Sequence, residues 1–101
     1  MTADSRLRSE TMDALFDAVL TLKSRDDCYA LFEDLCTVGE LHAMAQRFAV
    51  ASRLAAGEHY AEIARETGAS TATISRVKRC LEYGADGYRL VLERLGKKAS
   101  K

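Results

Sequence analysis

YAEIARETGASTATISRVKRCL, residues 60–81, carries small, apolar and polar residues at a spacing that is typical of a helix-turn-helix. Two short helices that cross at a steep angle need a small side chain where their backbones approach, and Ala64 supplies it. The turn needs a residue that tolerates positive φ, which is the property of Gly68. Ser70 follows as the expected N-cap of the second helix. The angle between the helices would be filled by Ile63, Ile74, Val77 and Leu81.

The second helix of this motif is the one that would enter the major groove of DNA. At about 100° per residue its apolar residues share one side, and Lys78 lies at the margin, where its aliphatic stem can follow apolar surface. On the opposite side, small residues permit close approach to a groove, hydroxyls bond bases or phosphates, and guanidiniums bind both. The residues that we expect to contact DNA are Ser70, Thr71, Ala72, Thr73, Ser75, Arg76, Lys78 and Arg79.

The charge of the chain is distributed unevenly, although its 15 basic and 15 acidic residues give a net charge of zero. Residues 1–68 carry seven Lys and Arg against twelve Asp and Glu, a net charge of −5. Residues 69–101 carry eight Lys and Arg against three Asp and Glu, a net charge of +5. The positive field therefore belongs to the second helix of the motif and to everything after it, which indicates a polyanionic partner at that end.

Cysteine and histidine are too few and too scattered to indicate a metal site. Cys28, Cys36 and Cys80 are an odd number without CxxC spacing, so we expect reduced thiols that serve as small core residues. Neither His42 nor His59 lies at metal-ligand spacing from another candidate.

An enzyme would need a convergent nucleophile, base and pocket, which this sequence does not indicate. We therefore expect no catalytic residues, no metal and no cofactor.

Length and hydropathy point to one soluble domain. The chain has 101 residues, the size of a single domain, and it lacks an apolar run as long as a transmembrane helix. Its first ten residues, MTADSRLRSE, do not have the pattern of a signal peptide. We therefore expect no membrane partner and a cytoplasmic, nucleoid-associated protein.

Helical periodicity extends along the chain and no stretch alternates with a period of two, so the sequence predicts an all-α fold of six helices. A first amphipathic helix is predicted from about residue 5 to residue 22, and Ser24 would cap a short second helix. Thr37 and Glu40 form a capping box that opens a third, longer helix, which would end just before Gly57. A final helix follows the helix-turn-helix.

The predicted helices carry one-sided apolar stripes that a chain of this size cannot bury within one subunit unless the helices pack tightly, and the first helix has no obvious groove within its own subunit. The stripe of the first helix is Met12, Leu15, Phe16, Val19 and Leu20, and that of the third is Leu41, Met44, Phe48, Ala51 and Ala55. Dimerisation would cover the first stripe and place two DNA-binding helices about one turn of DNA apart. We expect one domain, residues 1–101, with dimerisation helices in 1–56, the helix-turn-helix in 59–82, and a final helix and basic tail in 83–101.

Residues 32–95, and above all GASTATISRVKRCLEYGADGY at 68–88, resemble the YerC/YecD family, a branch of the tryptophan repressor superfamily. The resemblance is most specific over the helix-turn-helix. It implies an all-α, six-helix subunit in an intertwined homodimer whose N-terminal helices interlock with those of the partner. It also implies a bacterial transcriptional regulator, a repressor, that binds double-stranded DNA.

The same resemblance implies a ligand pocket, and here the sequence departs from the pattern of the tryptophan repressor, in which the indole of the corepressor lies between two arginines and beside a glycine. Arg47 and Arg76 match the arginines, and Thr37 matches a threonine near the pocket. Val77 stands at the glycine position, where a branched side chain fills the space of the ring. We therefore expect a vestigial pocket without response to tryptophan, and the identity of any other effector is unknown. Arg47 would then form surface or interhelical hydrogen bonds, and Arg76 would contact phosphate or guanine.

An alternative interpretation is a helical, dimeric protein-interaction module without specific DNA readout. An interaction helix should expose large apolar anchors. The outward side of the second motif helix instead carries Ala72, Ser75, Arg76 and Arg79. This composition favours a sequence-specific DNA-binding regulator.

Overall fold

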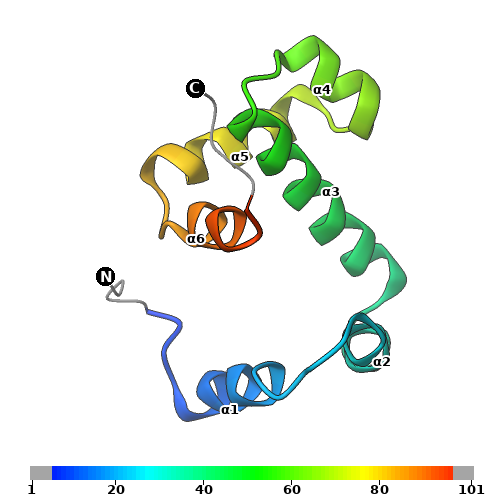
Figure 1. Ribbon diagram of the computed structural model, residues 1–101, viewed down its shortest axis with the longest axis vertical. Coiled ribbons are helices and arrows are strands. Elements are labelled where there is room, and N and C mark those ends of the chain that lie inside the picture. The colour runs from blue at the N-terminus through cyan, green and yellow to red at the C-terminus, as the bar shows by residue number, and fades with distance from the viewer. Residues whose placement is uncertain (1–5, 97–101) are drawn as a thin grey trace. The chain divides into compact units, whose positions relative to one another are not determined.

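The structure, a computed structural model, describes residues 6–96. Within this range the chain forms six helices and no strand, which confirms the predicted all-α fold (Figure 1). The helices are α1 (Glu10–Val19), α2 (Arg25–Leu35), α3 (Val38–Ala55), α4 (Tyr60–Thr67), α5 (Thr71–Tyr83) and α6 (Gly87–Arg94). None of them is long and apolar enough to cross a membrane. Residues 97–101 of the predicted basic tail, which begins at Gly96, lie outside the described range.

Serine caps decide where the first two helices begin. Ser9 Oγ accepts a hydrogen bond of 3.0 Å from the backbone N–H of Met12, and Ser24 Oγ accepts one of 3.0 Å from that of Asp27. Each cap satisfies an N–H that has no partner within the helix. The cap of α2 is the one predicted. The predicted start of α1 near residue 5 is wrong, because Ser9 caps the helix and α1 begins at Glu10.

α3 has the ends that the sequence predicts. Thr37 Oγ1 accepts a hydrogen bond of 3.1 Å from the N–H of Glu40, and Glu40 Oε1 accepts one of 2.8 Å from the N–H of Thr37. This is the predicted capping box, in which two otherwise unpaired donors are satisfied reciprocally. The helix stops at Ala55, and Gly57 follows with a φ of +88°, a conformation that glycine adopts without strain.

The chain divides into two compact units, residues 1–41 and 42–101. The first contains α1, α2 and the start of α3, and none of its described residues is fully buried. The buried apolar residues of the described chain all belong to the second unit. This second unit also holds the complete helix-turn-helix, which is formed by α4 and α5.

The core of the second unit joins α3, α4 and α5. Its buried residues are Val50 and Ala51 from α3, Ile63 from α4, Ala69 from the turn, and Ile74 and Val77 from α5. Leu81, near the end of α5, and Leu92 of α6 are buried as well. This arrangement confirms that Ile63, Ile74, Val77 and Leu81 fill the angle of the helix-turn-helix.

The buried side of α3 agrees only in part with the predicted stripe, of which Ala51 is buried and Leu41, Phe48 and Ala55 are half-buried. Val50, which the prediction omits, is fully buried beside Ala51, whereas Met44 remains 37% exposed. Alanines occur on several sides of this helix, so its apolar periodicity is weak and permits more than one buried side. The packing of α4 and α5 decides which side is covered, and that choice is not a property of α3 alone.

The cysteines are free, as predicted, but the prediction that they serve as core residues is wrong. Cys28 and Cys80 are exposed and Cys36 is half-buried. In α5 the larger apolar residues occupy the buried side, which leaves Cys80 outside it. Among residues 6–96, no three His, Cys, Asp or Glu side chains come together where they could hold a metal ion.

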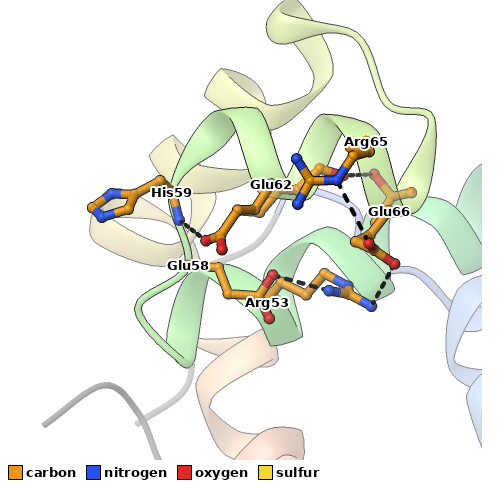
Figure 2. Close-up of polar contacts among 8 residues, drawn as sticks. Arg53, Glu58, His59, Glu62, Arg65 and Glu66 are labelled. Carbon is orange, nitrogen blue, oxygen red and sulfur yellow. Dashed lines mark hydrogen bonds and ion pairs between the residues drawn. The ribbon is translucent and has the colours of Figure 1, made fainter.

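An ion-pair network that the sequence analysis missed joins the end of α3 to α4 (Figure 2). Arg53 Nη1 lies 2.9 Å from Glu58 Oε1, and Arg53 Nη2 lies 4.0 Å from Glu66 Oε1. Arg65 Nε lies 3.8 Å from Glu66 Oε2. These side chains are partly exposed, and pairs of this kind stabilise a fold by about 1 kcal/mol or less. We infer that the network orients α4 on α3 more than it stabilises the core.

α4 is also held by hydrogen bonds at both ends. At its start, Glu62 Oε1 accepts a bond of 3.2 Å from the N–H of His59. At its end, Gln46 Nε2 of α3 donates a bond of 3.1 Å to the carbonyl oxygen of Thr67. The second bond satisfies a carbonyl of the last helical turn and fixes the position of the turn that leads into α5.

Gly68→Ala should lower the free energy of unfolding by about 1–2 kcal/mol. Gly68 has a φ of +73°, whereas an added Cβ would meet only Gln46 Nε2, at the ordinary contact distance of 3.9 Å. The cost is therefore backbone strain without a clash. Gly68→Asn should cost less, because asparagine tolerates the left-handed conformation. Urea unfolding followed by circular dichroism measures both values, and equal losses would contradict the role assigned to φ.

Val77→Gly should lower the free energy of unfolding by about 2–4 kcal/mol, because it empties a packed site and places glycine in a helix interior. The Val77 side chain is only 1% exposed. Ser75→Gly, on the exposed side of the same helix, is the matched control and should cost only about 0.5 kcal/mol in helix propensity. The same unfolding measurement compares the two variants. Similar losses for both would mean that Val77 does not act as a core residue.

Candidate nucleic-acid interface

The turn before α5 sets where this helix begins. Gly68 closes α4 in the left-handed conformation, and Ala69, only 5% exposed, fixes the turn in the core. Ser70 Oγ accepts a hydrogen bond of 3.1 Å from the N–H of Thr73 and donates one of 3.1 Å to Thr73 Oγ1. The predicted N-cap is therefore confirmed. Both hydroxyls are engaged with each other at the start of the helix.

α5 has one buried side and one exposed side, as its periodicity predicts. Its buried residues, Ile74, Val77 and Leu81, are each at most 8% exposed. Of the eight residues predicted to contact DNA, Thr73 is half-buried and the others are exposed. All eight lie on α5 or at its N-cap, so one element brings them together. As DNA contacts they remain a prediction. The exposed members are Ser70, Thr71, Ala72, Ser75, Arg76, Lys78 and Arg79.

The outward side of α5, which we define as Ala72, Ser75, Arg76 and Arg79, continues to the end of the helix at Tyr83. The Tyr83 side chain is 83% exposed. It lies four residues after Arg79 and eleven after Ala72, a spacing that places the three on one side of a helix. Tyr83 is not among the residues predicted from the sequence, although this spacing is the signal that could have found it.

Lys78 is positioned against α4. Its Nζ lies 5.8 Å from the centroid of the Tyr60 ring, within the range of a cation–π interaction. The predicted position at the margin of the apolar side is consistent with this contact. The ammonium group therefore has a fixed neighbour at the first residue of α4, and it is held beside the outward side of α5 instead of on it.

Arg76 and Arg79 differ from the arginines that hold the fold together. Arg53 pairs with Glu58 at the end of α3, and Arg89 Nε of α6 donates a hydrogen bond of 2.9 Å to the carbonyl oxygen of Leu81. Within residues 6–96, neither Arg76 nor Arg79 has a hydrogen-bond or ion-pair partner. Both guanidiniums are exposed and available to an external acceptor.

α5 ends sharply at Tyr83, and α6 is packed directly against it. A Cβ at Gly84 would collide with the carbonyl oxygen of Cys80, so the chain needs glycine where it leaves the helix. The bond from Arg89 satisfies one of the last carbonyls of α5 and ties α6 to it. α5, which presents the outward side, is thus fixed at both of its ends.

The residues of the predicted ligand pocket lie in different surroundings. Thr37 belongs to the first unit, where its hydroxyl is part of the capping box of α3. Arg47 is half-buried on α3 in the second unit. Arg76 and Val77 are neighbours on α5, about 100° apart around the helix, and Arg76 is exposed whereas Val77 is buried in the core. A pocket that these four residues share remains a prediction.

Comparisons with known proteins agree with this architecture. The chain is 52% identical over 90 residues to the uncharacterized protein YerC of Bacillus subtilis (strain 168), covering 89% of this chain and 86% of YerC. A crystal structure from Staphylococcus aureus, described as a candidate Trp repressor, superposes with a TM-score of 0.90 at 49% identity, covering 94% of this chain and 95% of that one. A TrpR-like protein from Eubacterium eligens ATCC 27750 superposes with a TM-score of 0.89, also at 49% identity, over 94% and 98% of the two chains.

The family described as Trp repressor protein matches residues 10–96, which include all six helices. The resemblance inferred from the helix-turn-helix residues is thereby confirmed. With this match and the identity to YerC, the chain belongs to the Trp repressor protein family.

Proposed function

We propose that this protein is a sequence-specific DNA-binding transcriptional regulator, acting as a repressor, that inserts α5 into the major groove. The observation that carries the proposal is the outward side of α5, where exposed guanidiniums without a partner in residues 6–96 stand beside small side chains. Small residues let the helix backbone approach the groove, and guanidiniums bind phosphates and guanine edges. Membership of the Trp repressor protein family supports the same function.

The charge distribution supports DNA as the partner at this end of the chain. Residues 69–101, which begin at the turn before α5, carry a net charge of +5, and residues 1–68 carry −5. Phosphate contacts supply most of the affinity that is independent of sequence, and they require clustered positive charge. A zero net charge over the whole chain is therefore compatible with DNA binding, because the two signs are separated along the chain.

A protein-interaction module is less well supported by the same surface. Interaction hot spots are enriched in Trp, Tyr and Arg, and they cluster near the centre of an interface around well-packed, desolvated anchors. On the outward side of α5, Tyr83 is the only large aromatic residue, and it stands at the end of the helix. Small and basic side chains occupy the rest. Affinity for DNA explains this composition, whereas an apolar protein partner does not.

We further propose that the regulator is a homodimer formed by the N-terminal helices. A soluble monomer rarely leaves large apolar side chains exposed in groups. Phe16 of α1 is 53% exposed. Leu20, the first residue after α1, is 81% exposed, and Leu35 of α2 is 49% exposed. Two copies related by a two-fold axis would cover these side chains and present two α5 helices to symmetric half-sites.

In this proposal the chain is one domain whose parts have different roles. Residues 1–56 contain the dimerisation helices, residues 59–82 the helix-turn-helix, and residues 83–101 the final helix and a basic tail. The dimer needs no metal or other cofactor to bind DNA. It would act in the cytoplasm, associated with the nucleoid.

We also propose that regulation is independent of tryptophan. Val77 stands where the resemblance places the glycine beside the indole of the corepressor, and it is 1% exposed within the core formed by α3, α4 and α5. Adding a ring to a packed site costs on the order of 1–3 kcal/mol or more. The side chain that excludes the ring also stabilises the helix-turn-helix, so the two properties are coupled.

The association constant K for DNA should fall steeply as the salt concentration rises. For each unit of log salt concentration, log K should fall by about 0.9 per neutralised phosphate. Fluorescence anisotropy with labelled fragments of the source genome at several salt concentrations measures the slope.

Arg76→Ala combined with Arg79→Ala should weaken DNA binding and leave the melting temperature unchanged, since both residues are exposed. Arg25→Ala, which removes one charge from the proposed dimerisation region, is the control. Absence of DNA affinity even at low salt would refute the regulator proposal.

Light scattering at micromolar concentration should give twice the chain mass of 11.1 kDa. Phe16→Asp should dissociate or unfold the dimer, because it places a charge among apolar contacts. Ala14→Asp introduces the same charge on the opposite side of α1 and is the matched control, expected to remain dimeric. A monomeric wild-type protein at this concentration would remove the basis for recognition of two half-sites.

L-tryptophan should neither bind nor act as a corepressor. Isothermal titration with millimolar tryptophan should give no saturable heat, because an overfilled site lowers affinity by roughly ten- to a hundredfold or more. The DNA affinity measured by anisotropy should be the same with and without the amino acid. Saturable binding at micromolar tryptophan would show that Val77 does not close the site.

A further inference from the structure

We propose that Arg79 reads a guanine in each half-site of the operator, whereas Arg76 and Ser75 hold the helix to the DNA backbone. This inference rests on the proposed function and deepens it, because it assigns a base to one side chain. It follows from two observations: which of the predicted DNA contacts are already engaged within the protein, and where the remaining ones lie around α5.

Three of the eight predicted contacts are engaged within the subunit and are therefore poor candidates for base readers. The hydroxyls of Ser70 and Thr73 are bonded to each other, with 3.1 Å between Ser70 Oγ and Thr73 Oγ1, and Ser70 Oγ also caps the helix. Lys78 lies over the Tyr60 ring, 5.8 Å from its centroid. Five side chains remain for recognition, namely Thr71, Ala72, Ser75, Arg76 and Arg79.

The direction of each remaining side chain follows from the buried side of α5. Ile74, Val77 and Leu81 define the direction of the core. At about 100° per residue, Ala72 and Arg79 lie within about 20° of the direction opposite to the core. These two residues form the midline of the outward side, seven residues and nearly two turns apart.

Arg76 and Ser75 lie to the two sides of this midline. Each is displaced from it by about 50°, in opposite senses. A helix in the major groove has the base edges in front of it and a phosphate backbone on either side. The midline side chains therefore face the bases, and the two flanking ones face the backbones.

The chemistry of the midline selects guanine. Guanidinium forms two hydrogen bonds with guanine O6 and N7, and this is the commonest specific contact of arginine in the major groove. Arg79 is exposed, and in residues 6–96 it has no ion-pair or hydrogen-bond partner to hold it away from a base. The side chains that read adenine with two bonds, Asn and Gln, do not occur in α5. Ala72 permits close approach and offers a methyl group to thymine.

The test starts with selection of binding sites from a random duplex library by the full-length wild-type protein. The selected site should contain a guanine in each half-site. Replacing that guanine by 7-deazaguanine, which lacks the N7 acceptor, should weaken wild-type binding about five- to fiftyfold. Arg79→Ala should bind the guanine and 7-deazaguanine sites equally. Arg79→Lys keeps the charge but loses the two-bond geometry, so it should retain affinity better than Arg79→Ala and discriminate less than wild type.

Arg76→Ala is the matched control on the same helix. It should weaken binding to both sites by a similar factor and preserve the discrimination between them, because a phosphate contact carries no base information. Retention of full discrimination by Arg79→Ala, or its loss in Arg76→Ala, would overturn the assignment. Binding without any enriched sequence would refute both the assignment and the sequence-specific function. A site enriched without a guanine that responds to Arg79 would overturn the assignment alone.

Discussion

The packing of the buried side of α5 against α3 and α4 is the constraint on which the rest of the structure depends. Ile63, Ile74 and Val77 are almost completely buried together with Val50 and Ala51. Because this contact fixes the rotation of α5 about its axis, it also fixes which residues face outward. A helix-turn-helix needs this rotation of its second helix before any DNA contact is possible. If α5 were rotated about its axis by one residue, an apolar side chain would face outward in place of an arginine.

Val77 connects this core to the question of regulation. The resemblance to the tryptophan repressor places a glycine at its position, beside the expected indole ring, whereas here a valine completes the core. A residue that fills a packed site lowers the free energy of the folded state and removes the space for a ligand in one step. The proposed loss of tryptophan response is therefore a consequence of how the helix-turn-helix is packed. It does not require a change in the two arginines that the resemblance matches to the pocket, Arg47 and Arg76.

Polar side chains of the second unit fall into those that hold the fold and those that remain free. Gln46 bonds the end of α4, Arg53 joins the end of α3 to Glu58, and Arg89 bonds the end of α5. These contacts occur where helices end and carbonyls or charges lack partners. Arg76 and Arg79 are different, because within residues 6–96 neither side chain has a hydrogen-bond or ion-pair partner. Their guanidiniums are therefore left for an external acceptor, and the proposed DNA contacts use this difference.

The sequence by itself determined the elements whose causes are local. The caps at Ser24, Thr37 and Ser70 and the turn at Gly68 depend on residues within four positions of each other, so they could be predicted, as could the two sides of α5. Only the tertiary structure decided that Val50 is buried, that Gln46 bonds Thr67 and that Lys78 lies over Tyr60. These contacts join different helices, and α3, with alanines on several sides, carries too weak a pattern to select its partner face. The burial of a residue depends on which other helices pack against it, and this packing is a property of the whole chain.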